Sequence, residues 1–216
     1  LLDYQKYPVL AAELSNQRRR PLGIGIINLA FWMAKHNMTY TDPNLPLIDE
    51  WAEAWSYYLI EASVKLAEEK GACEYSHETK YSDGLVPMDT RKEDVDELVP
   101  NVERQNWIEL RSRLKKSGIR NSTLMALMPA ETSAQISNST NGVEPPRAFV
   151  SVKQSKHGVL KQVVPGIHKF KSKYELLWDQ QSPQGYLKVM AVLQKYIDQG
   201  ISVNTSYNPV FFEEEK

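Results

Sequence analysis

The chain has 216 residues, a length that suits one domain and can bury a sizeable core. Its formal net charge of -1 argues against a broad basic surface for nucleic acid, although a few backbone amides could still bind a phosphate. A single cysteine, Cys73, excludes an internal disulfide and argues against a cysteine-based zinc site, which favours a reduced, cytoplasmic setting.

The two ends of the sequence indicate a piece of a longer polypeptide. No apolar run is long enough to span a bilayer, and the N-terminal residues lack the charged and apolar regions of a signal peptide. The chain begins without Met and ends just after a strand-like run, so we expect both ends to be cut. Residues needed for chemistry could then lie outside this chain.

Helices are predicted in the first part of the chain. Apolar residues at helical spacing predict a helix in the second half of residues 22–34. Gly23 and Gly25 form a GxG, but the third glycine of a dinucleotide-binding loop is missing, so we favour close helix packing. The clearest helix spans residues 47–70. Its apolar stripe predicts the buried face, and we expect the aromatic members to be core: Ile48, Trp51, Trp55, Leu59, Ala62 and Leu66.

The middle of the chain is less regular. Residues 74–105 are polar and predict a loop excursion with one short helix and a solvated charged face. A helix over residues 107–116 should turn Trp107, Leu110 and Leu114 inward and end at Gly118. Residues 119–128 predict a short strand that leads to Pro129.

The last part combines strands and one helix. Residues 147–152 and 159–164 predict two strands joined as a hairpin. A final helix opens at Ser182 and is expected to end at Gly200, and residues 201–205 predict a last strand. The inner face of that helix is expected to hold Leu187, Met190, Leu193 and Ile197. Helices alternating with short strands indicate an α/β, helix-rich fold.

Residues 126–146, ALMPAETSAQISNSTNGVEPP, carry the strongest functional signal. A strand-like run ends at Pro129, and a small residue, an acid and two hydroxyl residues open a helix: Ala130, Glu131, Thr132 and Ser133. The unpaired amides and the dipole of a helix N-terminus favour an anion, and a small residue lets a phosphate approach closely. A plain N-cap is the alternative. Residues 137–146 could hydrogen-bond a polar ligand, brace a neighbouring loop, or form a well-satisfied turn.

These and other motifs match a known family at many separate places. They are residues 120–124, 126–129, 131–133, 135–138, 140–142 and 144–147, with 1–4, 7–8, 19–20, 22–25, 34–36, 70–73, 162–165, 174–178 and 197–199. Together they closely resemble the large, catalytic subunit of class I ribonucleoside-diphosphate reductase. The resemblance covers the whole chain but only the C-terminal part of the family's chain. It implies that residues 1–216 are part of the catalytic domain, the C-terminal portion of a ten-stranded α/β barrel.

The resemblance implies a substrate site and a chemistry. Enzymes of this family convert ribonucleoside diphosphates to deoxyribonucleoside diphosphates through a cysteine thiyl radical. A metal-containing small subunit supplies the radical, and an external dithiol such as thioredoxin or glutaredoxin supplies electrons. The family's substrate-phosphate loop matches Pro129, Ala130, Glu131, Thr132 and Ser133. Ala130 departs from the Ser of close relatives, which puts one hydroxyl contact in doubt.

The resemblance also implies what this chain lacks. The thiyl cysteine, the reducing cysteine pair and the allosteric domain belong upstream of the matched region, and the tyrosines of the radical relay belong after Lys216. We therefore expect no catalytic residue, metal or cofactor in this chain. Cys73 matches a non-catalytic position and is expected to be a small packed hydrophobe. The scattered histidines are expected to be surface or structural residues: His36, His77, His157 and His168.

The expected partners follow from the same resemblance. They are a ribonucleoside diphosphate, the remaining large-subunit polypeptide, the small radical-generating subunit and a second large subunit in a homodimer, with no nucleic acid and no membrane. Alone, the chain is expected to be inactive. One alternative is a non-catalytic structural or assembly fragment that complements a companion chain. A weaker one is a plain phosphate- or nucleotide-binding protein.

Overall fold

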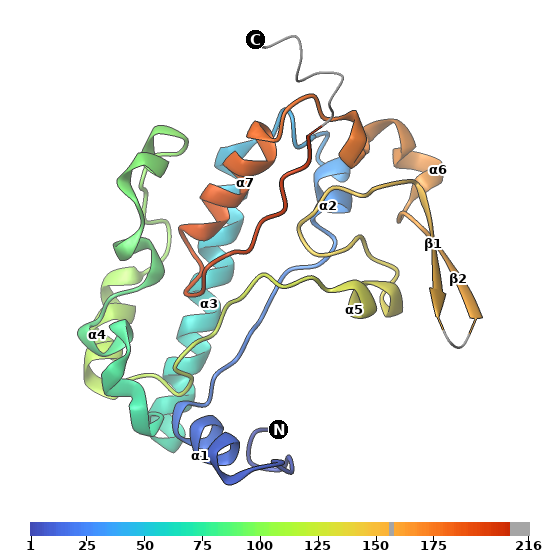
Figure 1. Cartoon of the computed structure of the whole chain (residues 1–216). Coiled ribbons are helices and arrows are strands. Elements are labelled where there is room, and N and C mark those ends of the chain that lie inside the picture. The colour runs from blue at the N-terminus through green and yellow to red at the C-terminus, as the bar shows by residue number, and fades with distance from the viewer. Residues whose placement is uncertain (156–157, 208–216) are drawn as a thin grey trace. The chain divides into compact units, whose positions relative to one another are not determined.

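The computed structural model describes residues 1–155 and 158–207 (Figure 1). The chain forms two compact units, each considered by itself below. Unit 1 comprises Leu1–Ile24, Pro46–Ala126 and Ala191–Gly200. Unit 2 comprises Gly25–Leu45, Leu127–Met190 and the residues from Ile201 onward. Helices dominate, as the sequence predicts, and the described residues form one sheet, of two strands.

The long helix α3 (Leu45–Lys70) contributes nine buried residues, but it does not bury the predicted face. Of the predicted stripe, Ile48 is buried, whereas Trp51 and Trp55 are half-buried and Leu66 is exposed. The buried face is offset from that stripe and is rich in small and acidic residues: Ile48, Asp49, Ala52, Glu53, Ser56, Ile60, Ser63, Val64 and Ala67. The prediction was wrong because it counted apolar residues alone, and this helix buries carboxylates that have cationic partners.

Those partners form a cluster, here called the buried charge cluster, in which Asp49, Glu53 and Lys195 are buried and the partly exposed Arg104 closes one side. The Nη1 of Arg104 lies 2.9 Å from Asp49 Oδ2 and 2.8 Å from Glu53 Oε2. The Nζ of Lys195 lies 3.1 Å from Asp49 Oδ1, which also accepts a hydrogen bond from the Tyr196 hydroxyl. Burying a charge is costly unless it is paired and hydrogen-bonded, and each carboxylate here meets both conditions.

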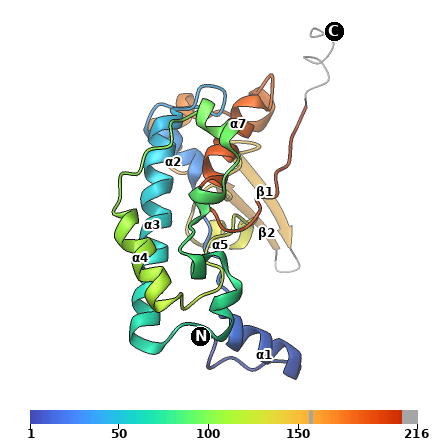
Figure 2. The same ribbon diagram turned by 90° about the vertical axis from the view of Figure 1, so that its left-hand side faces the viewer.

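Helix α4 (Trp107–Ser117) agrees with its prediction. Trp107, Leu110 and Leu114 are buried, and Gly118 is the C-cap that follows the last helical residue. It lies alongside α3 in both views (Figures 1 and 2), where Arg113 pairs with Glu68 at 2.9 Å. The indole N–H of Trp107 donates to Glu53 Oε1 at 2.9 Å, so α4 also closes one side of the buried charge cluster.

The remainder of unit 1 differs more from expectation. Helix α1 (Leu10–Arg19) was not predicted. The polar excursion contains four 3-10 helices rather than one helix: η1 (Glu74–Glu78), η2 (Lys80–Asp83), η3 (Pro87–Thr90) and η4 (Glu93–Glu97). Most of its charges are solvated as predicted, although Arg91 and Asp96 pair with each other and are half-buried.

The strand predicted over residues 119–128 is not formed. Met125 makes a single parallel bridge with Ile24, flanked by backbone hydrogen bonds such as Leu22 N to Thr123 O at 2.9 Å. The segment is extended, but its described pairing is too short for a strand, because a strand requires a neighbour along its length.

Unit 2 contains α2 (Leu29–Lys35), α5 (Glu131–Ile136), β1 (Val150–Ser155), β2 (Gly158–Val163), α6 (Ile167–Phe170), η5 (Lys171–Lys173), η6 (Leu177–Asp179) and the first part of α7 (Gln184–Gln194). Strands β1 and β2 pair antiparallel, with Val150 opposite Val163, which confirms the predicted hairpin. The first strand begins and ends three residues later than predicted, because residues 153–155, expected in the loop, continue the pairing. Residues 156 and 157, His157 among them, lie outside the described residues, as do residues 208–216.

Two further predictions need correction. Of the inner face expected for the last helix, Met190, Leu193 and Ile197 are buried, but Leu187 is 39% exposed. The helix ends at Gln194, before Gly200. The strand expected over residues 201–205 is absent, because the alternation of apolar residues there meets no partner strand among the described residues.

Candidate functional site

Residues 129–133, here called the 129–133 loop, open helix α5 as predicted. Ala130 is the N-cap, with φ of -115° and ψ of 36°, and no side chain caps the helix. Pro129, Thr132 and Ser133 are exposed and Ala130 is half-buried. The amides of Glu131, Thr132 and Ser133 fall in the first turn, where a helix provides no acceptor for them. The loop therefore presents backbone N–H groups near the surface of unit 2.

A second segment braces this loop. The amide of Ala130 donates to Oδ1 of Asn141 at 3.0 Å. The amide of Ser139 donates to the carbonyl of Ala134 at 2.8 Å, which ties the same segment to the end of α5. Of the three roles left open for residues 137–146, the hydrogen bonds support two: bracing a neighbouring loop, and a satisfied turn in which the Glu144 amide donates to the Asn141 carbonyl at 3.3 Å.

The bracing segment is itself anchored on α2. Asn28 and Thr140 exchange two hydrogen bonds of 3.0 Å, since the Asn28 amide donates to the Thr140 carbonyl and the Thr140 amide donates to Asn28 Oδ1. The amide of Leu29 donates to the carbonyl of Gly142 at 3.3 Å. The buried hydroxyl of Tyr40 donates to the carbonyl of Val143 at 2.7 Å, and burial raises the pKa of this phenol well above its usual value.

Asn28 and Tyr40 could not be predicted from the sequence, because each lies about a hundred residues from its partner. The separation is 112 residues for Asn28 and Thr140, and 103 for Tyr40 and Val143. Asn28 has a φ of 71°, a left-handed conformation that asparagine tolerates better than most residues. That conformation gives a local reason for asparagine just before α2, but it does not reveal the partner.

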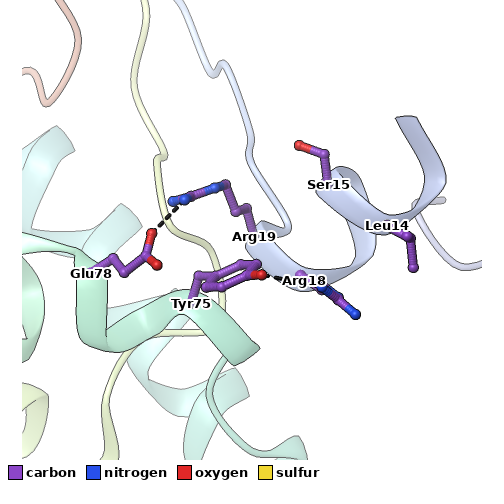
Figure 3. Close-up of a pocket in the computed structure, with 6 residues that line it drawn as sticks. All are labelled: Leu14, Ser15, Arg18, Arg19, Tyr75 and Glu78. Carbon is purple, nitrogen blue, oxygen red and sulfur yellow. Dashed lines mark hydrogen bonds and ion pairs between the residues drawn. The ribbon is translucent and has the colours of Figure 1, made fainter. Parts of the chain in front are cut away.

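Unit 1 holds a separate cavity of about 280 Å³ between α1 and η1 (Figure 3). Its charges are already paired: Arg18 lies 3.4 Å from Glu74, and Arg19 forms an ion pair with Glu78. The Arg19 guanidinium also stacks over the Tyr75 ring at 4.8 Å. These contacts hold α1 against η1 and leave the cavity no unpaired cation for an anion.

A second cavity of unit 1, about 240 Å³, is lined in part by Tyr81 and Asp198. Asp198 Oδ2 accepts from the Leu124 amide at 2.7 Å and from the Tyr81 hydroxyl at 2.9 Å. Its Oδ1 accepts from the Met125 amide at 2.9 Å. This carboxylate thus fixes the extended segment that precedes the 129–133 loop in sequence.

The described residues were compared with the requirements of a metal site, a reactive cysteine and a membrane-spanning helix. Within residues 1–155 and 158–207, no group of three or more His, Cys, Asp or Glu residues is placed to hold a metal ion. Cys73 is buried, as expected for a packed hydrophobe, and burial raises the pKa of its thiol. In the same described ranges, no helix has the length and apolar character needed to cross a membrane.

Comparison with known proteins gives a consistent result. The family described as ribonucleotide reductase, barrel domain, matches residues 1–177. Ribonucleoside-diphosphate reductase subunit alpha of Haemophilus influenzae is 52% identical over 100% of this chain and 29% of its own length. Ribonucleoside-diphosphate reductase 1 subunit alpha of Escherichia coli K12 is 49% identical over 100% of the chain and 28% of its own length. Ribonucleoside-diphosphate reductase subunit alpha of Enterobacteria phage T4 is 45% identical over 100% of this chain and 29% of its own length. The chain thus spans less than a third of the length of these relatives.

Proposed function

The chain belongs to the ribonucleotide reductase barrel-domain family, and on that premise we propose that it is part of a ribonucleoside-diphosphate reductase large subunit. The reductase converts ribonucleoside diphosphates to deoxyribonucleoside diphosphates by thiyl-radical chemistry. This part supplies substrate phosphate binding and walls of the barrel. The observation that carries the proposal is the exposed 129–133 loop at the start of α5, within the residues that match the family.

The loop binds the substrate's phosphates through its backbone. The amides of Glu131, Thr132 and Ser133 donate to phosphate oxygens, and the exposed hydroxyls of Thr132 and Ser133 add two donors. The helix dipole favours the negative charge. Pro129 sets the entry to the turn. Ala130 leaves room for the phosphate but offers no hydroxyl, and its amide is bonded to Asn141.

This chain alone does not turn over substrate. The thiyl-radical reaction and its re-reduction require several cysteines, and the sequence contains one, the buried Cys73. Turnover needs the remaining large-subunit polypeptide and a metal-containing small subunit that supplies the radical. It also needs an external dithiol such as thioredoxin or glutaredoxin. The large subunit acts as a homodimer in the cytoplasm.

Reconstitution tests this proposal. The chain is combined with a polypeptide that carries the missing parts of the large subunit, with the small subunit and with a dithiol reductant, and conversion of CDP to dCDP is measured. Activity is expected from the complete mixture and from no mixture that lacks one component. Activity from the chain alone would refute the division of roles.

The phosphate site is tested by two substitutions in the assembled enzyme. Thr132→Ala removes a hydroxyl, whereas Thr132→Pro also removes an amide donor at a first-turn position where proline is tolerated. Affinity for CDP is expected to fall in both variants, and further in Thr132→Pro, while affinity for cytidine stays unchanged. If the enzyme assembles and neither variant affects CDP binding, the chain acts as a structural or assembly fragment.

A further inference from the structure

Asn141 links the 129–133 loop to a segment that is hydrogen-bonded to the start of α2. Its Oδ1 accepts the Ala130 amide at 3.0 Å, and its side chain is half-buried. An asparagine side chain has only two torsions, so few rotamers are available to it and a fixed backbone at residue 141 restricts where this oxygen can lie. The orientation of the loop therefore depends on how firmly that backbone is held.

Both neighbours of Asn141 are held by α2. Thr140 exchanges two hydrogen bonds with Asn28, and the Gly142 carbonyl accepts from Leu29. Leu29 is buried, as are Met33 and Ala34 further along this helix. A residue fixed on each side by a packed helix has little freedom. Asn141 thus joins a well-packed helix to an exposed loop that no side chain caps.

The same bond determines which amides remain for a ligand. The Ala130 N–H is directed to Asn141, so it is not available to a phosphate. The donors that follow in sequence belong to Glu131, Thr132 and Ser133. Fixing the N-cap residue of a short helix fixes the direction of these first-turn amides, because the peptide planes of one turn are coupled.

We propose that Asn141 is a positioning residue for substrate phosphate: it holds the Ala130 amide and so aims the amides of Glu131, Thr132 and Ser133 at one phosphate group. This assignment rests on the proposed function of the 129–133 loop. Preorganised donors cost no reorganisation when the ligand arrives, so a loop held in this way binds phosphate more tightly than a mobile one. Asn141 itself touches no substrate.

Asn141→Ala in the assembled large subunit removes the acceptor. Dissociation constants are measured for CDP, for inorganic pyrophosphate and for cytidine. The constants for CDP and pyrophosphate are expected to rise about tenfold, the order of one net hydrogen bond, and the constant for cytidine to stay unchanged. In turnover, KM for CDP should rise by the same factor with little change in kcat, as expected when uniform binding is lost. Ala148→Ser, at an exposed position outside the loop, is the matched control.

Hydrogen exchange at the Ala130 amide reports the bond directly. Exchange is expected to be slow in the wild type, fast in Asn141→Ala and slow again in Asn141→Asp, which keeps an oxygen at the same place. A merely structural role for Asn141 would change exchange throughout unit 2 rather than at Ala130. If Asn141→Ala does not assemble, Asn141→Ser gives the same comparison, since its shorter side chain does not reach the amide.

The outcomes separate this inference from the proposed function. If Thr132→Pro weakens CDP binding and Asn141→Ala does not, the phosphate site stands and the positioning role of Asn141 is overturned. If neither variant changes CDP affinity, the proposed site itself fails. Loss of cytidine affinity in Asn141→Ala would also overturn the inference, because it would show a general loss of fold.

Discussion

The Nζ of Lys195 lies 3.1 Å from Oδ1 of Asp49, and neither side chain is exposed to solvent. Removing one member of a buried pair leaves a buried charge without compensation, at a cost of about 3–5 kcal/mol. Lys195→Met should therefore lower the free energy of unfolding by about 3 kcal/mol. Urea denaturation measures the change.

The control for this prediction is Lys65→Met, because Lys65 lies 3.9 Å from Glu61 and its side chain is 61% exposed. Surface pairs of this kind contribute at most about 1 kcal/mol. Equal losses for the two variants would contradict the importance assigned to the buried charge cluster.

Substitution of Trp107, which packs on the buried face of α3, and of Trp55, which lies on α3 itself, tests which face of α3 belongs to the core. Trp107 is fully buried and donates to Glu53, whereas Trp55 lies on the half-buried face of α3 and stacks on Trp51. Trp107→Ala should cost about 3–5 kcal/mol, and Trp55→Ala at most about half of that. Thermal unfolding of both variants measures the difference. A larger loss of unfolding free energy for Trp55→Ala than for Trp107→Ala would show that the face of α3 predicted from the apolar stripe is the buried one.

Gly185 is required for close packing inside unit 2. A Cβ at this position would lie 2.0 Å from the carbonyl oxygen of Tyr40, a backbone atom that cannot move aside. Gly185→Ala should destabilise the chain by about 3 kcal/mol or more. Gly200→Ala is the matched control, because nothing lies within 4 Å of its added Cβ. Circular dichroism melting curves of the two variants should differ clearly.

Tyr81 makes stability depend on alkaline pH. Burial and the Asp198 carboxylate raise the pKa of Tyr81 well above its ordinary value of 10.0. The folded chain keeps this proton where the unfolded chain releases it, so the contribution of Tyr81 is complete below pH 10 and decreases as pH rises toward the folded pKa. Between about pH 9 and about pH 11, the wild type should lose unfolding free energy more steeply than Tyr81→Phe.

Urea denaturation across this range gives the slopes for the wild type and for Tyr81→Phe. Tyr58→Phe, at a tyrosine that is 58% exposed, is the control for the loss of a surface phenol. Identical slopes in all three proteins would show that Asp198 and burial do not hold the Tyr81 proton.

Ala130→Ser should strengthen substrate binding if the 129–133 loop holds phosphate. The substitution adds a hydroxyl at a half-buried N-cap position, where serine is also a favourable residue. One added hydrogen bond predicts a gain of about 0.5–1.5 kcal/mol in CDP binding. Calorimetry of the assembled enzyme measures it, with Ala148→Ser as a control of the same chemistry outside the loop. An unchanged affinity for CDP would place the phosphate beyond reach of residue 130.

Sequence by itself determined the local elements whose signals are short-range. The inward residues of α4, its end at Gly118, the hairpin of β1 and β2 and the start of α5 all follow from periodicity, turn residues and capping chemistry within a few positions. The motifs also determined the family, since matches at many separate places are specific even though no local rule explains them.

Tertiary structure decided the features that depend on distant partners. Asp49 and Glu53 lie on the buried face of α3 because Arg104 and Lys195 reach them from far along the chain. Residues 201–205 form no strand, because apolar alternation does not supply a partner.

The 129–133 loop shows both contributions. Its helix start could be predicted from residues 129–133 alone, through the unpaired amides of a first turn. Two other features could not be predicted in this way: the hydrogen bond that the Ala130 amide donates to Asn141, and the anchoring of Thr140 by Asn28. These bonds join residues that are 11 and 112 positions apart in the sequence. Local chemistry supplied the donors, and long-range packing decided which of them remain for a ligand.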